Sequence, residues 1–175
     1  MSLPVLRAAI RSDALALAEL ARRCFAATYT PTHDAARIRI HCQTVLSDAA
    51  VSHWFGDDAA YILVAQRGAE LLGFVQWQTA TAPVAARHPI ELKRLYVDAA
   101  VHGSGLGQRL FDAVRTDAAR VGADLLWLCV YAGNDRARRF YARQGMAAIG
   151  QVPFCFVDQI ENDIALGLDP GAATP

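Results

Sequence analysis

The stretch ELKRLYVDAAVHGSGLG, residues 91–107, decides the fold of this chain. Its first seven residues are typical of a β-strand, and a helix is predicted from about Gly105 to Val121, where Gly122 ends it. Between them lies a loop rich in glycine, whose residues are His102, Gly103, Ser104, Gly105, Leu106 and Gly107. Glycines let several backbone N–H groups point at one place, and the following helix adds its positive end. The stretch therefore predicts an anion site that suits a pyrophosphate.

Other interpretations of the glycine loop are a plain tight turn or a different nucleotide loop. Three glycines cost roughly 0.5–1 kcal/mol each relative to alanine, so a loop without a ligand would be unfavourable. A Walker loop ends in Gly-Lys-Ser/Thr, whereas Gln108 and Arg109 follow Gly107 here. A Rossmann fingerprint has the spacing GxGxxG, whereas this loop has GxGxG. A flavin or nicotinamide protein stays an alternative interpretation, although the loop matches neither the Walker nor the Rossmann pattern.

The rest of the chain predicts an α/β protein with a mixed sheet, formed as a single domain over residues 1–170 with a frayed tail at 171–175. Ser12 or Asp13 is suited to cap the first helix, which Pro31 ends, and Asn134 is suited to cap a short helix that stops at Gly145. Further helices are expected at residues 34–46 and 51–55, with a turn at Gly56, Asp57 and Asp58. Strands are expected at residues 5–10, 61–66, 71–79, 91–97, 125–131, 147–149, 154–157 and 163–168. The second and third of these strands favour an antiparallel hairpin.

Composition limits the partners and the compartment. The chain has 175 residues with 17 basic and 17 acidic side chains, so it has no overall attraction for nucleic acid or an acidic membrane. It contains no run of about 18 apolar residues and no signal-peptide pattern, so neither a membrane span nor export is expected. Four cysteines, none in a CxxC pair or at zinc-ligand spacing, predict free thiols, no metal and a cytoplasmic protein. They are Cys24, Cys42, Cys129 and Cys155.

Two segments together resemble the GNAT superfamily of N-acetyltransferases. The strand Glu-Leu-x-Arg-Leu-Tyr-Val, the glycine loop and the helix are similar to the family's motif A, although His102 stands where the family usually has Arg or Gln. The strand at 125–131, Asn134, Ala137 and the run from Phe140 to Met146 resemble motif B, with Met146 replacing the common Phe. The resemblance extends over nearly the whole chain. It implies a GNAT fold: a mostly antiparallel sheet of six to seven strands, flanked by helices, in which two parallel strands splay apart to admit pantetheine.

The resemblance also implies a function: transfer of an acetyl group from acetyl-CoA to a primary amine of a small molecule, possibly polyamine-like in character, or of a peptide or protein. The alternative is a non-catalytic acyl-CoA sensor on the same fold. Glu91 is the candidate base, acting through water, although it also fits a solvated strand end. Tyr141 matches the family's general acid, although it also fits a core aromatic. Backbone groups of Leu95, Tyr96 and Val97 would hold the pantetheine, and the glycine loop and Asn134 would contact the cofactor.

The acceptor pocket should come from the early helices and two loops, and homodimers are common in the family. Side chains available to the acceptor are Trp54, Trp77, Asp57, Asp58, His88 and Phe154. Asp57 and Asp58 also fit a plain turn. Because the phosphate contacts come mostly from backbone N–H groups, we expect His102 to weaken cofactor binding rather than abolish it.

Overall fold

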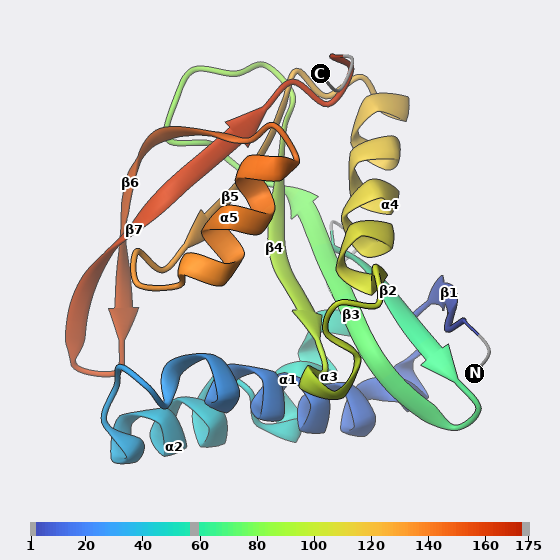
Figure 1. Cartoon of the computed structure of the whole chain (residues 1–175), viewed down its shortest axis with the longest axis vertical. Coiled ribbons are helices and arrows are strands. Elements are labelled where there is room, and N and C mark those ends of the chain that lie inside the picture. The colour runs from blue at the N-terminus through green and yellow to red at the C-terminus, as the bar shows by residue number, and fades with distance from the viewer. Residues whose placement is uncertain (1–2, 57–59, 173–175) are drawn as a thin grey trace. The chain divides into compact units, whose positions relative to one another are not determined.

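A seven-stranded sheet runs through the structure, a computed structural model that describes residues 3–56 and 60–172. The strands are β1 (Val5–Ala8), β2 (Ala60–Arg67), β3 (Glu70–Thr79), β4 (Pro89–Val97), β5 (Leu125–Val130), β6 (Ala147–Phe156) and β7 (Gln159–Leu168). Their order in the sheet is β1-β2-β3-β4-β5-β7-β6. β4 and β5 are parallel, whereas β1–β2, β5–β7 and β6–β7 pair antiparallel. The predicted mixed sheet with one parallel pair is therefore confirmed, with seven strands (Figure 1).

The described residues divide into two compact units, and β4 contributes to both. The first comprises residues 3–56, 60–77 and 94–112, and the second comprises residues 78–93 and 113–172. The single domain expected over residues 1–170 stays a prediction. None of the helices in the described part combines the length and the apolar character that a membrane crossing requires.

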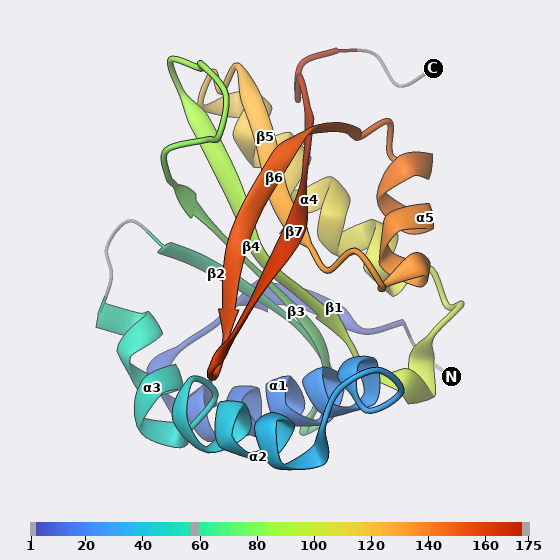
Figure 2. The same cartoon turned by 90° about the vertical axis from the view of Figure 1, so that its left-hand side faces the viewer.

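The first unit packs three helices beside the early strands. Its helical segments are η1 (Arg11–Asp13), α1 (Ala14–Tyr29), α2 (Ala35–Thr44), α3 (Asp48–His53), η2 (Trp54–Gly56) and η3 (Ala99–Val101). In Figure 2, α1, α2 and α3 lie together on one side of β1–β3. The core between them contains fully buried side chains from α1, α3, β2 and β3, namely Leu17, Leu20, Val51, Val64 and Phe74. Burial of this apolar surface is what holds the helices against the strands.

Helix caps explain where α2 and α3 begin. Asp34 Oδ1 accepts hydrogen bonds from the N–H groups of Ala36 and Arg37 at 2.9 and 3.2 Å, which confirms the helix predicted from residue 34. Ser47 caps α3 through a 3.1 Å bond from Ala50 N, so that helix starts earlier than the predicted residue 51. The turn predicted at Gly56, Asp57 and Asp58 lies partly outside the described residues.

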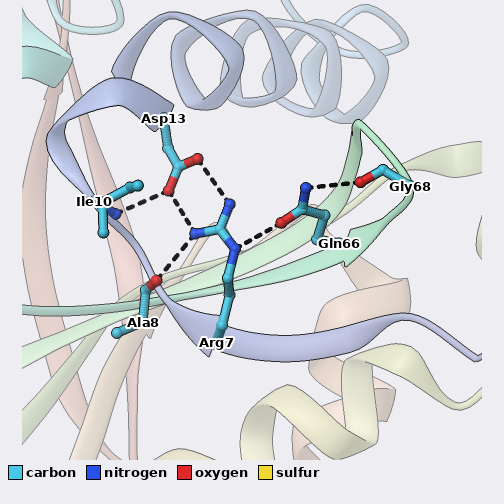
Figure 3. Close-up of polar contacts among 6 residues, drawn as sticks. All are labelled: Arg7, Ala8, Ile10, Asp13, Gln66 and Gly68. Carbon is cyan, nitrogen blue, oxygen red and sulfur yellow. Dashed lines mark hydrogen bonds and ion pairs between the residues drawn. The ribbon is translucent and has the colours of Figure 1, made fainter.

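Asp13 has a different role from the helix cap that its position predicted. It precedes α1, but its side chain makes no cap bond. Instead both carboxylate oxygens accept from Arg7, at 2.7 and 2.8 Å, and Oδ2 also accepts from Ile10 N (Figure 3). Arg7 Nε donates to Gln66 Oε1 at 2.6 Å, and Gln66 donates onward to the carbonyl of Gly68. The Arg7 guanidinium therefore binds the carboxylate in place of the backbone N–H groups at the start of α1. Its hydrogen bonds link β1 to η1 and, through Gln66, to the β2–β3 turn.

Replacing Asp13 with asparagine should lower the free energy of unfolding by about 1 kcal/mol at neutral pH, because Arg7 loses a charged, two-bond partner. The Arg7 guanidinium holds the pKa of Asp13 below its usual value. The contribution is therefore present above the unfolded-state pKa and is lost as the pH falls through the folded-state value. Urea unfolding at pH 7 and pH 3 measures both parts. The control is Asp34→Asn, since asparagine caps a helix as well as aspartate; an equal loss in both variants would contradict the role given to Arg7.

The second unit contains the C-terminal half of α4 (Leu106–Arg120), together with β5, α5 (Asp135–Arg143), β6 and β7. The predicted strand at 125–131 and the helix ending before Gly145 are confirmed. The strands predicted separately at 147–149 and 154–157 are wrong as separate elements, because they form one strand, β6. Pro153 lies within this strand, and β6 is the edge strand of the sheet, where a residue without an N–H is tolerated. The pairing of β6 with β7 shifts register once, between Ala148 and Gly150.

Candidate active site

The glycine loop joins η3 to α4 in the first unit. Gly103 and Gly105 have φ angles of +79° and +81°, a left-handed backbone that other residues adopt only with strain. A Cβ placed on either glycine would have no heavy atom within 4 Å, so this side of the loop is open. Leu106 is only 2% exposed, which leaves its backbone as the part available to a ligand. Leu106 and Gly107 open α4, where N–H groups find no acceptor within the helix.

Polar contacts hold the start of this loop in place. Asp98 N donates to Leu72 O on β3 at 2.9 Å, and the Asp98 carboxylate accepts from Ala100 N and from Arg23, both at 3.0 Å. The hydrogen bond from Ala100 is the main reason why the pKa of Asp98 lies below its usual value, with Arg23 adding to it. His102, the residue that departs from the family pattern, bonds through Nε2 to the carbonyl of Val97 at 2.9 Å. Because a carbonyl only accepts, Nε2 is the donor, and the imidazole ties the loop to the end of β4.

The end of β4 is packed tightly within the first unit. A Cβ on Gly73 would stand 2.9 Å from the carbonyl oxygen of Tyr96, so only glycine allows this approach of β3 to β4. The Tyr96 ring meets Phe74 edge to face at 5.2 Å, and burial raises the pKa of the phenol to about 12. The Tyr96 phenol therefore stays protonated at neutral pH. Leu95, Tyr96 and Val97, the predicted pantetheine contacts, form the last three residues of the strand.

Arg94 lies on the same strand and organises several polar and aromatic side chains. It donates to Gln76 Oε1 at 2.7 Å, and its guanidinium carbon lies 4.3 Å from the centre of the Trp54 ring. Burial first, and then the charge of Arg94, lowers the pKa of His41 to about 4, so this histidine is neutral at pH 7. Trp54, expected at the acceptor, holds Arg94 in a cation–π contact, and its place at the acceptor stays a prediction.

Glu91 lies in the second unit, in the parallel ladder between β4 and β5. It pairs with Trp127, and its Oε2 accepts from Gln78 Nε2 at 3.1 Å and lies 3.6 Å from Lys93 Nζ. The ladder joins Pro89–Glu91 to Leu125–Trp127, and no further pair continues it among the described residues, although β5 runs on to Val130. Glu91 therefore stands at the last paired position of the two parallel strands.

Strand register places several further polar side chains on the face of the sheet that carries Glu91. Paired residues of neighbouring strands point to the same face, as do residues two apart along one strand. Trp127 pairs with Gly167 and Cys129 pairs with Ala165, so Asp163 and Glu161 share this face. The residues on it are Glu91, Lys93, Trp127, Cys129, Glu161 and Asp163, which we call the carboxylate face. The opposite face carries the buried apolar side chains Ile90, Leu92, Leu126 and Leu128.

Burial dominates the titration of two groups on the carboxylate face. It raises the pKa of the Cys129 thiol to about 11, with Asp163 and Glu91 adding to the shift. It also raises the pKa of Asp163 to about 6, and the charge of Glu161 acts in the same direction. Cys129 is thus a neutral thiol at pH 7, consistent with the free cysteines predicted. Of the described cysteines, Cys155 is the exposed one, on the edge strand β6.

α5 carries the remaining predicted site residues of the second unit. Asn134 Oδ1 accepts from Ala137 N at 3.1 Å, which confirms the predicted cap. Tyr141 is 7% exposed and meets Phe140 edge to face at 5.1 Å. Its burial is compatible with both of its interpretations, as a core aromatic or as a general acid, and its catalytic role stays a prediction.

The acceptor residues expected from sequence are divided between the two units, and their role stays a prediction. Trp77 is 5% exposed and stacks with Tyr61 in the first unit, while Asp57 and Asp58 lie outside the described residues. In the second unit, His88 N donates to Asp124, and Phe154 pairs with Glu161 at the carboxylate face. Asp163, Cys129 and Trp127 were missed. The predicted strand began at Asp163 and left out Glu161, whereas β7 includes both and their alternation puts the two carboxylates on one face.

Comparisons with known proteins agree with this fold. A model of the acetyltransferase (GNAT) family matches residues 15–146, so the chain belongs to the GNAT family, a class of acyltransferases. Uncharacterized N-acetyltransferases of Mycobacterium bovis and Mycobacterium tuberculosis are each 30% identical over 155 residues, covering 89% of this chain and 96% of the relative.

Two solved structures show the same fold. The PaiA N-acetyltransferase from Thermoplasma acidophilum, in complex with coenzyme A, is similar with a TM-score of 0.80 and 20% identity over 97% of this chain and 99% of its own. A GCN5-related N-acetyltransferase from Rhodopseudomonas palustris gives 0.76 and 19% over 97% of both chains.

Proposed function

We propose that this protein transfers an acetyl group from acetyl-CoA to a primary amine of a small molecule, a peptide or a protein. The observation that carries the proposal is the glycine loop, with two left-handed glycines facing open space directly before α4. Membership of the GNAT family and the likeness to a fold that binds coenzyme A support it.

The chain's own groups suit coenzyme A in two respects. The N–H groups of His102 and Ser104 donate to the carbonyls of Ala99 and Val101, so those of the loop glycines and of the first turn of α4, with the positive helix end, are the ones that suit the anionic pyrophosphate. Among the described residues, the β4–β5 ladder covers Pro89–Glu91 and Leu125–Trp127, before the end of either strand. Backbone groups of Leu95, Tyr96 and Val97 would bond the amides of the pantetheine arm, and Asn134 has amide hydrogens left beyond its cap.

The proposed chemistry gives one proton-transfer role to each of two residues. Acetyl-CoA, when bound, supplies the acetyl group as a thioester. Glu91 removes a proton from the incoming ammonium through water, since only a neutral amine attacks a carbonyl carbon. A new C–N bond forms, the C–S bond breaks, Tyr141 donates a proton to the departing sulfur, and the second proton that the nitrogen loses restores the phenol through water. Backbone N–H groups at the end of β4 stabilise the oxyanion.

Replacing Gly105 with alanine should weaken coenzyme A binding about tenfold, since a strain of roughly 1–2 kcal/mol displaces the loop backbone. Isothermal titration calorimetry with coenzyme A measures the effect. The matched control is Gly68→Ala, because Gly68 also has a positive φ of +62° and open space but lies in the β2–β3 turn. Both variants should lose similar stability. Equal affinity for coenzyme A in the two would contradict the phosphate role of the loop.

The test of the function is a screen for coenzyme A release with acetyl-CoA against aliphatic amines, polyamines, amino acids, aminoglycosides and peptide N-termini. We expect turnover with at least one class, together with a rise in melting temperature on adding acetyl-CoA. Stabilisation without turnover would favour the acyl-CoA sensor instead. Absence of both would overturn every role given to coenzyme A here.

A further inference from the structure

Glu91 is held by two nitrogen groups that meet at the same carboxylate oxygen. Gln78 Nε2 donates to Oε2 at 3.1 Å, and Lys93 Nζ lies 3.6 Å from the same atom. An ionised carboxylate only accepts hydrogen bonds, so the Gln78 amide has to present its nitrogen to Glu91. Within the described part of the chain, Oε1 of Glu91 makes no hydrogen bond or ion pair. One oxygen of this carboxylate is therefore anchored, while the other is left to accept from a water molecule.

The hydrogen bond from Gln78 restrains Glu91 more than the ion pair with Lys93 does. The Lys93 side chain is 39% exposed, whereas that of Glu91 is 16% exposed. Ion pairs that reach the solvent contribute little, because water screens the charges and a long side chain loses freedom in forming them. Gln78 is the penultimate residue of β3, which neighbours β4 in the sheet, and its hydrogen bond is assisted by the carboxylate charge. Gln78 is thus the main anchor of Oε2.

An anchored carboxylate matters most where it has to move a proton. A glutamate side chain has several rotatable bonds and, without an anchor, would spread over different rotamers. A base has to stand within hydrogen-bond reach of the proton that it removes, or of the water that carries this proton. A displacement of about 1 Å can lower a rate as much as hundredfold. β3 and β4 are already joined by backbone hydrogen bonds, so the strands do not need the Gln78 side chain in order to pair.

We propose that Gln78 is a positioning residue for the acetyl transfer. By holding Oε2 of Glu91, it directs Oε1 to the water that carries the proton away from the incoming ammonium. The inference rests on the function proposed above, in which Glu91 is the base, and adds a residue that acts through Glu91 rather than on either substrate. One proton passes from the ammonium through water to Oε1, and the Gln78 amide neither gains nor loses a proton. Lys93 adds a smaller restraint at the same oxygen.

The test is a double-mutant cycle of Gln78→Met and Glu91→Gln, run in the coenzyme A release assay with acetyl-CoA and the best amine of the screen. Methionine has nearly the length of glutamine but no N–H donor. We expect Gln78→Met to lower kcat about tenfold with KM almost unchanged, because the interaction acts in the chemical step. In the Glu91→Gln background the same substitution should leave kcat unchanged, since no base remains to be positioned. Lys93→Met should lower kcat less than Gln78→Met does.

Two further variants separate loss of the donor from loss of stability. Gln66→Met is the matched control, because Gln66 also bonds a charged side chain, that of Arg7 at 2.6 Å, but lies in the first unit. It should keep the wild-type kcat. Gln78→Lys retains an N–H donor at this position and should keep most of the wild-type kcat. Melting curves of all variants show which of them are folded.

The outcomes separate this inference from the proposed function. No turnover of any amine by the wild type overturns both together. A kcat of Glu91→Gln equal to that of the wild type overturns the base role of Glu91, and the positioning role with it. If Glu91→Gln is impaired, a wild-type kcat in Gln78→Met, or an equal loss in both backgrounds, overturns the role of Gln78 alone. A kcat of folded Gln78→Lys as low as that of Glu91→Gln also overturns it, and this comparison remains if Gln78→Met does not fold. A loss confined to the background with Glu91, with Gln66→Met unaffected, supports the inference.

Discussion

Replacing Tyr141 with phenylalanine should lower the turnover number at least tenfold while the affinity for coenzyme A stays almost unchanged. The substitution removes one oxygen and keeps the ring that meets Phe140 in the second unit. Phenylalanine has nearly the same shape as tyrosine and is apolar, which suits a residue that is 7% exposed. We therefore expect the fold to persist. A tenfold loss corresponds to about 1.4 kcal/mol in the activation free energy, within the range of one hydrogen bond to a developing charge. An interaction made mainly in the transition state changes kcat rather than binding.

The matched control for Tyr141→Phe is Tyr61→Phe, which removes a phenolic oxygen from an exposed tyrosine that stacks with Trp77. Steady-state kinetics in the coenzyme A release assay and calorimetry with coenzyme A are needed for both variants. Turnover of Tyr141→Phe equal to wild type would leave the residue as a core aromatic. A large loss of coenzyme A affinity would instead indicate that the hydroxyl supports the cofactor site.

The strand–loop–helix region was predictable because its local signals agree with one another. The apolar strand, the glycines and the helix that follows all favour one local structure, which residues 91–120 adopt. Asn134 was equally clear, since a polar cap before a helix satisfies backbone N–H groups whatever packs around it. The predicted number of strands in the sheet came from the family resemblance rather than from periodicity. Short apolar runs do not reveal which strands pair with one another.

The errors arise where a distant residue competes for a side chain. Asp13 was predicted as a cap, but Arg7 offers it two charged hydrogen bonds that no local pattern reveals. β6 was predicted as two pieces, whereas Pro153 between them is tolerated because the strand lies at the edge of the sheet. Cys129 and Asp163 were missed for a related reason. Whether these two side chains share a face of the sheet depends on the register between β5 and β7, and tertiary pairing sets that register.

Asp163 should also be a residue that lowers the stability of the free protein. Its pKa is raised to about 6 from 3.8, first by burial and then by Glu161, so the folded state binds a proton more tightly than the unfolded chain does. Between these two values, stability falls as the pH rises, because the folded protein must ionise a buried group that the unfolded chain ionises freely. Two pKa units correspond to about 3 kcal/mol, taken as an upper limit. A residue kept at such a cost fits a binding role better than a structural one.

Asp163→Asn should therefore raise the free energy of unfolding by up to about 3 kcal/mol at pH 8, equivalent to a melting temperature higher by roughly 5–10 °C. The gain should shrink as the pH falls through 6 and vanish near pH 4, where wild-type Asp163 is neutral as well. Asp13, Asp98 and Asp124 have lowered pKa values, but they are common to both proteins and cancel in the difference. Urea unfolding of both proteins at pH 4, 6 and 8 measures the effect. A variant less stable than wild type at pH 8 would mean that the Asp163 carboxylate has a stabilising partner within the protein.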